Sequence, residues 1–136
     1  MGQIRDLMTS NPTTCEPSTT VLEAAKRMAK EDVGSIPVVE RDRLVGLVTD
    51  RDIVVRAVAE GRDPMSTTLR DIASSDLETV SPDDDLDKAL RKMASSQVRR
   101  LPVVEGDRLV GVVAQADVAR KGEDAKTGQV VEQISR

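Results

Sequence analysis

The chain repeats itself once, and this duplication constrains its fold more than any other feature. Residues from about Ile4 to Arg56 match residues from Leu69 to Lys121 without gaps, at the constant offset of 65 positions that separates Pro37 from Pro102. The longest identical stretch has the sequence DRLVG and stands in both copies. Two copies of one unit indicate that neither buries its apolar face alone, so we expect the copies to pack together with approximate two-fold symmetry.

Each copy changes its hydrophobic periodicity in the same order. A helical stripe comes first, because apolar residues recur at helical spacing in both copies: Val21, Ala24, Ala25, Met28 and Ala29, then Leu86, Ala89, Leu90, Met93 and Ala94. We interpret these stripes as core faces, and the lysines and arginines between them as solvated surface.

Two β-rich runs follow each helix, joined by the tight connections Arg41-Asp42 and Gly106-Asp107, and this pattern predicts a β-hairpin. A short extended segment precedes each helix, and a second helix is predicted from about Asp50 to Glu60 in the first copy. Each copy therefore has the order β-α-β-β-α. We predict an α/β fold in which small mixed sheets are flanked by helices.

We assign the whole chain, residues 1–136, to one module with one hydrophobic core. The first motif spans about 4–60, a Gly-, Pro- and Ser/Thr-containing connector spans 61–68, and the second motif spans about 69–121. A polar tail covers 122–136, with a weak helical stripe near its end.

Composition argues against several classes of function. The chain has no aromatic residue, a net charge of −4 and a pI near 4.9, so it lacks both stacking platforms and a basic groove for nucleic acid. No stretch reaches eighteen apolar residues and no signal peptide is recognisable, so we expect a cytoplasmic protein without membrane contact. One cysteine and no histidine argue against a metal site, and we expect Cys15 to be a small buried hydrophobe.

Catalysis is also disfavoured. The chain has no histidine, no nucleophile motif with a partner base, and no Gly-rich phosphate-binding loop. Three consecutive acids, Asp83-Asp84-Asp85, invite a Mg²⁺ interpretation. Because they follow Ser81-Pro82 at the start of a helix, we interpret them as capping groups that complement the helix dipole. We therefore expect neither an enzyme nor a required cofactor.

At this point the sequence resembles the CBS-domain family, named after cystathionine β-synthase, in which two β-α-β-β-α motifs form a pair called a Bateman module. The resemblance covers roughly residues 4–121. It is carried by the order and duplication of three segments: Arg5-Asp6-Leu7-Met8-Thr9, Ile36-Pro37-Val38-Val39, and Gly46 to Asp52. The chain resembles the small stand-alone members, which usually form homodimers.

The resemblance implies a regulatory site for an adenosine-containing ligand, such as AMP, ADP, ATP or S-adenosylmethionine, in clefts between the motifs. The family pattern Gly-apolar-x-Thr/Ser-x-x-Asp ends at an aspartate that accepts hydrogen bonds from ribose hydroxyls, and here it is matched by Gly46, Leu47, Thr49 and Asp52. A carboxylate is suited to a cis-diol, and helical N–H groups near Asp50 together with Arg51 suit a phosphate. The candidate residues of this first site are Thr14, Ile36, Pro37, Val38, Thr49, Asp50, Arg51 and Asp52.

The second copy departs from the pattern, since Ala114 replaces the hydroxyl residue and Gln115-Ala116 replaces Asp50-Arg51. We therefore expect a weaker second site, with Arg99-Arg100 as partial compensation through phosphate contacts or, alternatively, as a solvated or salt-bridged pair. Its candidate residues are Thr79, Arg100, Leu101, Pro102, Val103 and Asp117.

Two interpretations stay open for the motif at Thr49 and Asp52, and two for the chain as a whole. Thr49 and Asp52 form either part of a ribose site or a capping box at the start of a helix. The whole chain is either a ligand-responsive module that senses adenylates and signals to an unknown regulated protein, or a constitutive dimeric interaction module with vestigial clefts.

Overall fold

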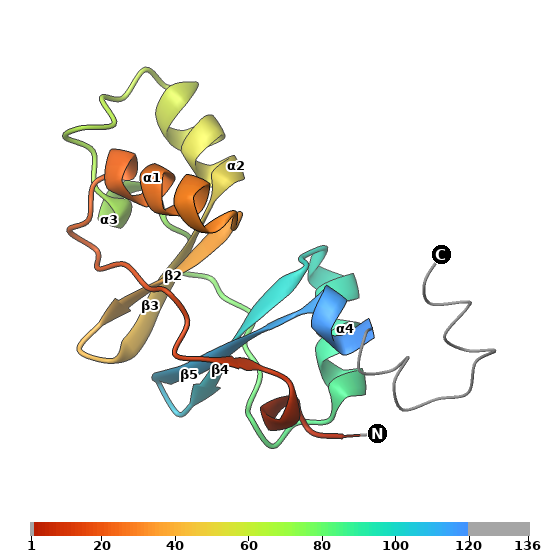
Figure 1. Cartoon of the computed structure of the whole chain (residues 1–136). Coiled ribbons are helices and arrows are strands. Elements are labelled where there is room, and N and C mark those ends of the chain that lie inside the picture. Colours follow the sequence, from red (N-terminus) through yellow and green to blue (C-terminus); the bar gives the residue numbers. More distant parts are fainter. Residues whose placement is uncertain (1, 120–136) are drawn as a thin grey trace. The chain divides into compact units, whose positions relative to one another are not determined.

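The computed structural model describes residues 2–119, which belong to two compact units (Figure 1). We call residues Thr13–Leu77 the contiguous unit, because one stretch of chain forms it. We call the other the split unit, because it combines Met1–Pro12 with the chain from Glu78 onward. The two units do not coincide with the two sequence repeats.

The contiguous unit is built on a hairpin. Strands β2 (Ser35–Glu40) and β3 (Arg43–Thr49) pair antiparallel, from Ser35 opposite Thr49 to Glu40 opposite Arg43. The turn residues Arg41 and Asp42 both have positive φ, 54° and 67°, which suits the twist of a two-residue hairpin. The helices that follow in chain order are α1 (Val21–Glu31), α2 (Asp50–Asp52), the π-helix η2 (Ile53–Val58) and α3 (Leu69–Ile72).

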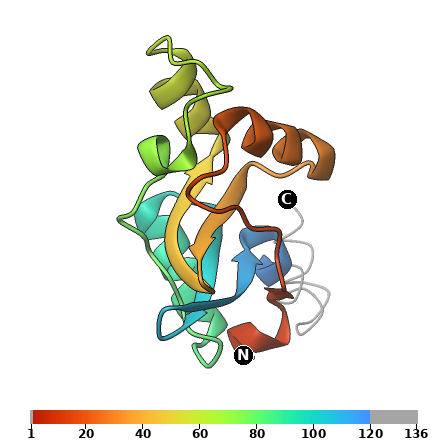
Figure 2. The ribbon, with the colours of Figure 1, turned by 90° about the vertical axis from the view of Figure 1, so that its left-hand side faces the viewer.

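The split unit contains the corresponding hairpin of β4 (Arg100–Glu105) and β5 (Arg108–Ala114), with α4 (Leu86–Ser96) before it. The 3-10 turn η1 (Ile4–Asp6) and the short strand β1 (Thr9–Ser10) complete it, because β1 pairs antiparallel with β5. Figure 2 shows this red N-terminal segment beside the blue strand β5. Residues 115–119 after β5 are helical.

Both predicted first helices are present, and each has a polar side chain at its start. The Thr20 hydroxyl accepts the Glu23 N–H of α1 at 3.2 Å, and the Asp85 carboxylate accepts the Asp87 N–H of α4 at 2.9 Å. The second interaction confirms that an acid of the 83–85 run caps the helix. Both helices end at a left-handed residue, as is common where a helix stops.

The buried face of each helix is narrower than its predicted stripe. The first, fourth and eighth residues of each helix are buried, whereas the ninth, Ala29 or Ala94, is exposed, and the expectation for these two alanines is wrong. The reason is geometric: successive residues turn by about 100°, so the ninth position lies about 80° from the first, beyond the edge of the buried face.

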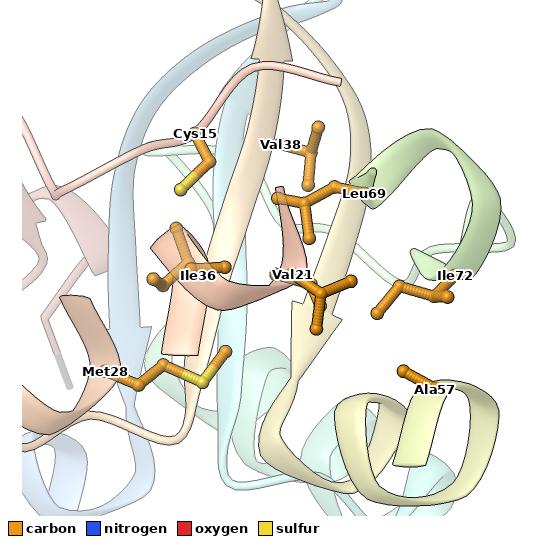
Figure 3. Packing of buried hydrophobic residues seen from close by; sticks show 10 residues of the cluster. Cys15, Val21, Met28, Ile36, Val38, Ala57, Leu69 and Ile72 are labelled. Atoms are coloured by element: carbon orange, nitrogen blue, oxygen red, sulfur yellow. The ribbon is translucent and has the colours of Figure 1, made fainter. Parts of the chain in front are cut away.

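The expectation of one core is also wrong, because the structure has two clusters of buried side chains. Figure 3 shows the cluster of the contiguous unit, where residues from α1, β2, η2 and α3 point toward one another. The split unit has its own cluster around α4, β4 and β5. The expectation for Cys15 is confirmed, since it is 2% exposed and belongs to the first cluster.

The repeats exchange their first segments. Leu69 and Ile72 begin the second repeat in the sequence, yet they lie in the core of the contiguous unit, while Ile4 of the first repeat lies in the core of the split unit. The hydrogen bonds correspond at the repeat offset. Leu69 and Arg70 donate their N–H groups to the carbonyls of Thr19 and Pro17, and Ile4 and Arg5 donate to those of Asp84 and Pro82.

The α/β class and the β-α-β-β-α order are confirmed. Each unit adds a short parallel pairing before its first helix, Cys15 with Val38 and Val80 with Val103, so pairing in each is mixed as predicted. The second helix of the first repeat is confirmed over Asp50–Val58, although only its first turn is α-helical. The expected end of the second motif and the tail over 122–136 lie outside the described residues.

Candidate ligand-binding sites

Thr49 and Asp52 form the capping box that was one of the two interpretations of this motif. Strand β3 ends at Thr49, whose Oγ1 accepts the Asp52 N–H at 3.0 Å, and Asp52 Oδ2 accepts the Thr49 N–H at 2.9 Å. Both bonds satisfy backbone donors that the start of a helix leaves without partners. The capping interpretation is therefore confirmed, and a ribose contact can only come in addition to it.

The second carboxylate oxygen of Asp52 takes no part in the cap. Oδ1 lies 3.8 Å from Nε of Arg56, one turn further along, and the Asp52 side chain is 16% exposed. At this distance the pair is an ion pair rather than a close hydrogen bond. Because each carboxylate oxygen has two lone pairs, Oδ1 retains capacity to accept from a hydroxyl group.

Asp50 and Arg51, the residues expected near a phosphate, are both exposed. The Asp50 N–H donates to the Gly34 carbonyl at 2.9 Å, and its Oδ1 accepts the Arg51 N–H at 2.8 Å. Only Asp50–Asp52 are α-helical before the π-helix begins. A single turn carries little dipole, so the helix contribution expected for a phosphate is weakened and Arg51 remains the candidate cation.

The strand residues of the first candidate site lie beside the cap. Ile36, Pro37 and Val38 are buried in β2, and Ser35 before them pairs with Thr49. The Pro37 carbonyl accepts the Cys15 N–H at 3.0 Å. The backbone groups of this strand are thus partly engaged in the sheet, which leaves aliphatic packing as the main contribution that the strand can make to a ligand site.

Thr14 contributes its carbonyl to a neighbouring cation. Arg27 of α1 donates from Nη1 to the Thr14 carbonyl at 2.8 Å and approaches Cys15 Sγ at 3.4 Å. Burial raises the pKa of the Cys15 thiol, against the opposing effect of Arg27. The thiol is therefore a packing group at neutral pH rather than a nucleophile.

The second candidate site repeats this arrangement without the cap hydroxyl. Lys92 Nζ donates to the Thr79 carbonyl at 2.6 Å, as Arg27 does to Thr14, and the Arg99 carbonyl accepts the Gln115 N–H at 2.7 Å. The strand residues Leu101, Pro102 and Val103 are buried in β4, Arg100 lies opposite Ala114 at its start, and Asp117 is half-buried. Each candidate set thus falls within one unit.

Sequence reasoning missed three cations that the structure places near these residues. Arg27 and Lys92 were interpreted as solvated surface, and Arg56 had no predicted role. The first two carry a signal in retrospect, because a cation stands at the same repeat position in both copies. Arg56 carries the same signal, since Lys121 stands at its repeat position, and it follows Asp52 by four residues, whereas its contact with Ile72 arises only through the exchange of segments.

Two further findings concern residues 2–119. No group of three or more His, Cys, Asp or Glu side chains among them is arranged to hold a metal ion. Within the same part of the chain, no helix combines the length and apolar character needed to cross a membrane. A shallow hollow of about 370 Å³ over the outer face of α4 contains none of the predicted site residues; it is lined by Glu78, Lys88, Arg91, Lys92, Ser95 and Ser96.

Comparison with known proteins identifies the family. The model of the CBS domain matches twice, over residues 4–58 and 69–124, so the chain belongs to the CBS domain family. It is similar to the CBS domain-containing protein YhcV of Bacillus subtilis, with 43% identity over 119 residues that cover 88% of this chain and 84% of YhcV. No enzymatic family is indicated by these matches.

Solved structures of CBS pairs share the fold. Hypoxic Response Protein I with two coordinated zinc ions is 38% identical, with a TM-score of 0.81 and coverage of 89% of this chain and 99% of that chain. CBSX2 in complex with AMP is 25% identical, with a TM-score of 0.82 and coverage of 93% and 100%. The CBS domain pair of MJ0100 with 5-methylthioadenosine and S-adenosyl-L-methionine is 27% identical, with a TM-score of 0.80 and coverage of 93% and 99%.

Proposed function

We propose that this chain is a non-catalytic regulatory module that binds an adenosine-containing nucleotide, with Asp52 as the ribose contact. The observation that supports this most is the geometry of Asp52: the cap fixes its carboxylate through Oδ2 and leaves Oδ1 with acceptor capacity. Fixing the group in advance lowers the entropic cost of binding. The AMP and S-adenosylmethionine complexes of related CBS pairs favour this ligand class.

The first site is the stronger of the two in this proposal. It combines Thr49, Asp52 and the exposed cation Arg51, whereas the second has Ala114, Asp117 and Gln115-Ala116 at the corresponding positions. Loss of a hydroxyl and of a cation weakens a nucleotide site by at least several-fold, since one hydrogen bond contributes about 1 kcal/mol. We therefore propose one dominant site per chain.

A cytoplasmic location remains a prediction from composition.

Equilibrium dialysis read at 260 nm tests the proposal directly. The chain has no Phe, Tyr or Trp, so absorbance at this wavelength reports the adenine ring with little protein background. AMP, ATP and S-adenosylmethionine are compared at the same concentration of protein. We expect micromolar affinity for at least one of them, and no retention of any of the three would reject the proposed function.

A matched pair of variants locates the site. Asp52→Asn keeps an oxygen for the Thr49 N–H, so the cap persists, but it places an NH2 group, which cannot accept from a ribose hydroxyl, where Oδ1 stands. We expect it to weaken ligand binding by at least about fivefold. Asp117→Asn is the control in the second repeat and has a smaller effect. Equal affinity of the Asp52→Asn variant and the wild type would contradict the site assignment.

A constitutive dimeric module is the second candidate function. Its support is an exposed apolar patch on η2 of the contiguous unit, where Val54, Val55 and Val58 lie within five residues of one helix and are 44–64% exposed. Such a patch is typical of a protein interface, and a second copy of this chain is the proposed occupant. Light scattering that gives a dimer, together with no binding of the three nucleotides, would favour this function over the first.

A further inference from the structure

Arg56 contacts two groups that the sequence separates widely. It lies in η2, one turn after Asp52, and its Nε is 3.8 Å from Asp52 Oδ1. Its Nη1 donates a hydrogen bond of 3.2 Å to the carbonyl of Ile72, sixteen residues further on. One guanidinium therefore links the carboxylate of the candidate ribose site to α3.

The Ile72 carbonyl lies at the end of α3, where a carbonyl needs a hydrogen-bond partner from outside the helix. Ile72 is the last residue of this four-residue helix, and the last carbonyls of a helix have no partner within it. Directly after it, the Ala73 N–H donates to the Leu69 carbonyl at 2.8 Å, and Ser74 exchanges two 2.9 Å hydrogen bonds with Leu47 of β3. The Arg56 bond thus holds the end of α3 on one side, while β3 holds the segment that follows.

We propose that Arg56 is a positioning residue that couples the Asp52 carboxylate to α3, and so transmits occupancy of the ligand site into the second repeat. The transmission step rests on the proposed function. A ribose hydroxyl that donates to Asp52 Oδ1 approaches the same oxygen that Arg56 faces. Binding there changes the attraction between the Asp52 carboxylate and the Arg56 guanidinium. The strength of the hydrogen bond from Arg56 to the Ile72 carbonyl changes with it. Because α3 stands at the beginning of the second repeat, this change enters the other copy of the motif.

The ion pair by itself does not carry the proposal. Arg56 is 48% exposed, and an exposed pair four residues apart on a helix contributes little. The distinguishing feature is the third member, a backbone carbonyl next to the fully buried Ile72 side chain. A three-membered network of this kind predicts that the effects of altering Asp52 and Arg56 on α3 are not additive.

Hydrogen exchange in the ligand-free protein tests the link between Asp52, Arg56 and α3. The amides of Ala73 and Ser74 are followed by NMR in the wild type, Asp52→Asn, Arg56→Gln and the double variant. We expect Arg56→Gln to speed their exchange by about threefold to tenfold, in line with loss of one hydrogen bond from a charged donor at a half-exposed site. Asp52→Asn changes exchange in the wild-type background but not in the Arg56→Gln background.

Two further variants serve as controls for this double-mutant cycle of Asp52 and Arg56. Arg62→Gln removes the same charge from an exposed residue of the connector and leaves these amides unchanged. Arg56→Lys keeps the charge but lacks the planar fork of donors, so its exchange rates fall between those of the wild type and Arg56→Gln. Additive effects of Asp52→Asn and Arg56→Gln, or wild-type exchange in Arg56→Gln, would overturn the proposal.

Saturation with AMP then tests the transmission step. In the wild type we expect AMP to change the exchange of Ala73 and Ser74 by at least about threefold; Arg56→Gln still retains AMP in dialysis but loses this change. The same AMP-dependent change in Arg56→Gln would refute transmission through Arg56. Failure of the wild type to retain AMP would instead reject the proposed function, and the ligand-free cycle would still decide whether Arg56 couples the two groups.

Discussion

The loop before each first helix is closed by a different side chain in the two repeats. In the first repeat, the Thr19 hydroxyl accepts the Glu16 N–H at 3.1 Å. In the second, the corresponding residue is Asp84, whose Oδ2 accepts the Ser81 N–H at 2.8 Å and whose Oδ1 lies 3.3 Å from Lys88 Nζ. The Ser81 N–H, assisted by Lys88, holds the pKa of the Asp84 carboxyl below its usual range.

This difference predicts a pH-dependent contribution to stability from the second loop alone. A carboxyl group with a lowered pKa in the folded state stabilises the fold above its ordinary pKa of about 4, and this stabilisation is lost as the pH falls through the folded-state value. Asp84→Asn should therefore lower the free energy of unfolding at pH 7 by about 1 kcal/mol or less, since the group is near the surface. At about pH 2 the variant and the wild type should converge.

Urea denaturation at the two pH values measures this effect. Thr19→Val is the matched control, because it removes the corresponding hydrogen bond of the first repeat without removing a titratable group. Its cost should be the same at both pH values. An Asp84→Asn cost that does not change between pH 7 and pH 2 would contradict the assignment.

Among the elements, the segments that precede the first helices depart most from the order of the sequence. Strand β1 pairs with β5 through Thr9 opposite Val112 and Ser10 opposite Gly111. The corresponding contact in the contiguous unit joins Leu47 to Ser74. In both units a glycine of the second hairpin strand permits the approach, because a side chain there would meet the carbonyl of the crossing segment.

The two glycines predict unequal costs of substitution by alanine. A Cβ on Gly111 would lie 2.8 Å from both the Thr9 carbonyl oxygen and Met8 Sδ, whereas a Cβ on Gly46 would lie 3.1 Å from the Ser74 carbonyl oxygen. We expect Gly111→Ala to destabilise the protein by about 1–3 kcal/mol, as overpacking usually does, and Gly46→Ala to cost less. Thermal denaturation followed by circular dichroism measures both, and the reverse order would show that β1 does not pack against β5 as described.

The longer helices and the hairpins were predictable from the sequence, but the short elements η1, β1 and α3, and their partners, were not. Apolar spacing indicated α1 and α4, and the turn residues indicated both hairpins, because these signals are local. The position of α3 is set by Leu69 and Ile72, whose side chains pack into a core that the preceding repeat forms. Periodicity shows that such a side chain is buried, and it does not show against which copy.

At the scale of the whole molecule, the exchange of segments predicts which fragments fold. Residues 13–77 contain every member of the contiguous unit's buried cluster, whereas a fragment that ends at residue 65 lacks Leu69 and Ile72. We expect residues 13–77 to give a cooperative urea transition, and residues 1–65 to give none, although a domain of this size is marginally stable. Circular dichroism decides the matter, and two fragments of equal stability would contradict the described core.

The candidate site was predictable in its residues but only partly in its geometry. The motif ending at Asp52 could be recognised from spacing, and so could the capping box, because both depend on neighbouring residues. The pairing of Asp52 with Arg56, four residues later, is local as well, whereas the link from Arg56 to Ile72 arises from tertiary packing. The sequence also cannot distinguish among adenosine-containing ligands, since adenine and ribose are common to all of them.

The most direct test of the central claim is an amide NMR titration of the ¹⁵N-labelled chain with AMP. If Asp52 holds the ribose, the largest shifts should occur at the amides of residues 49–52 and of Ile36 and Val38, and Asp52→Asn should require at least about fivefold more AMP for the same shifts. AMP that binds while these amides stay unmoved, or that moves them equally in the variant, would contradict the account.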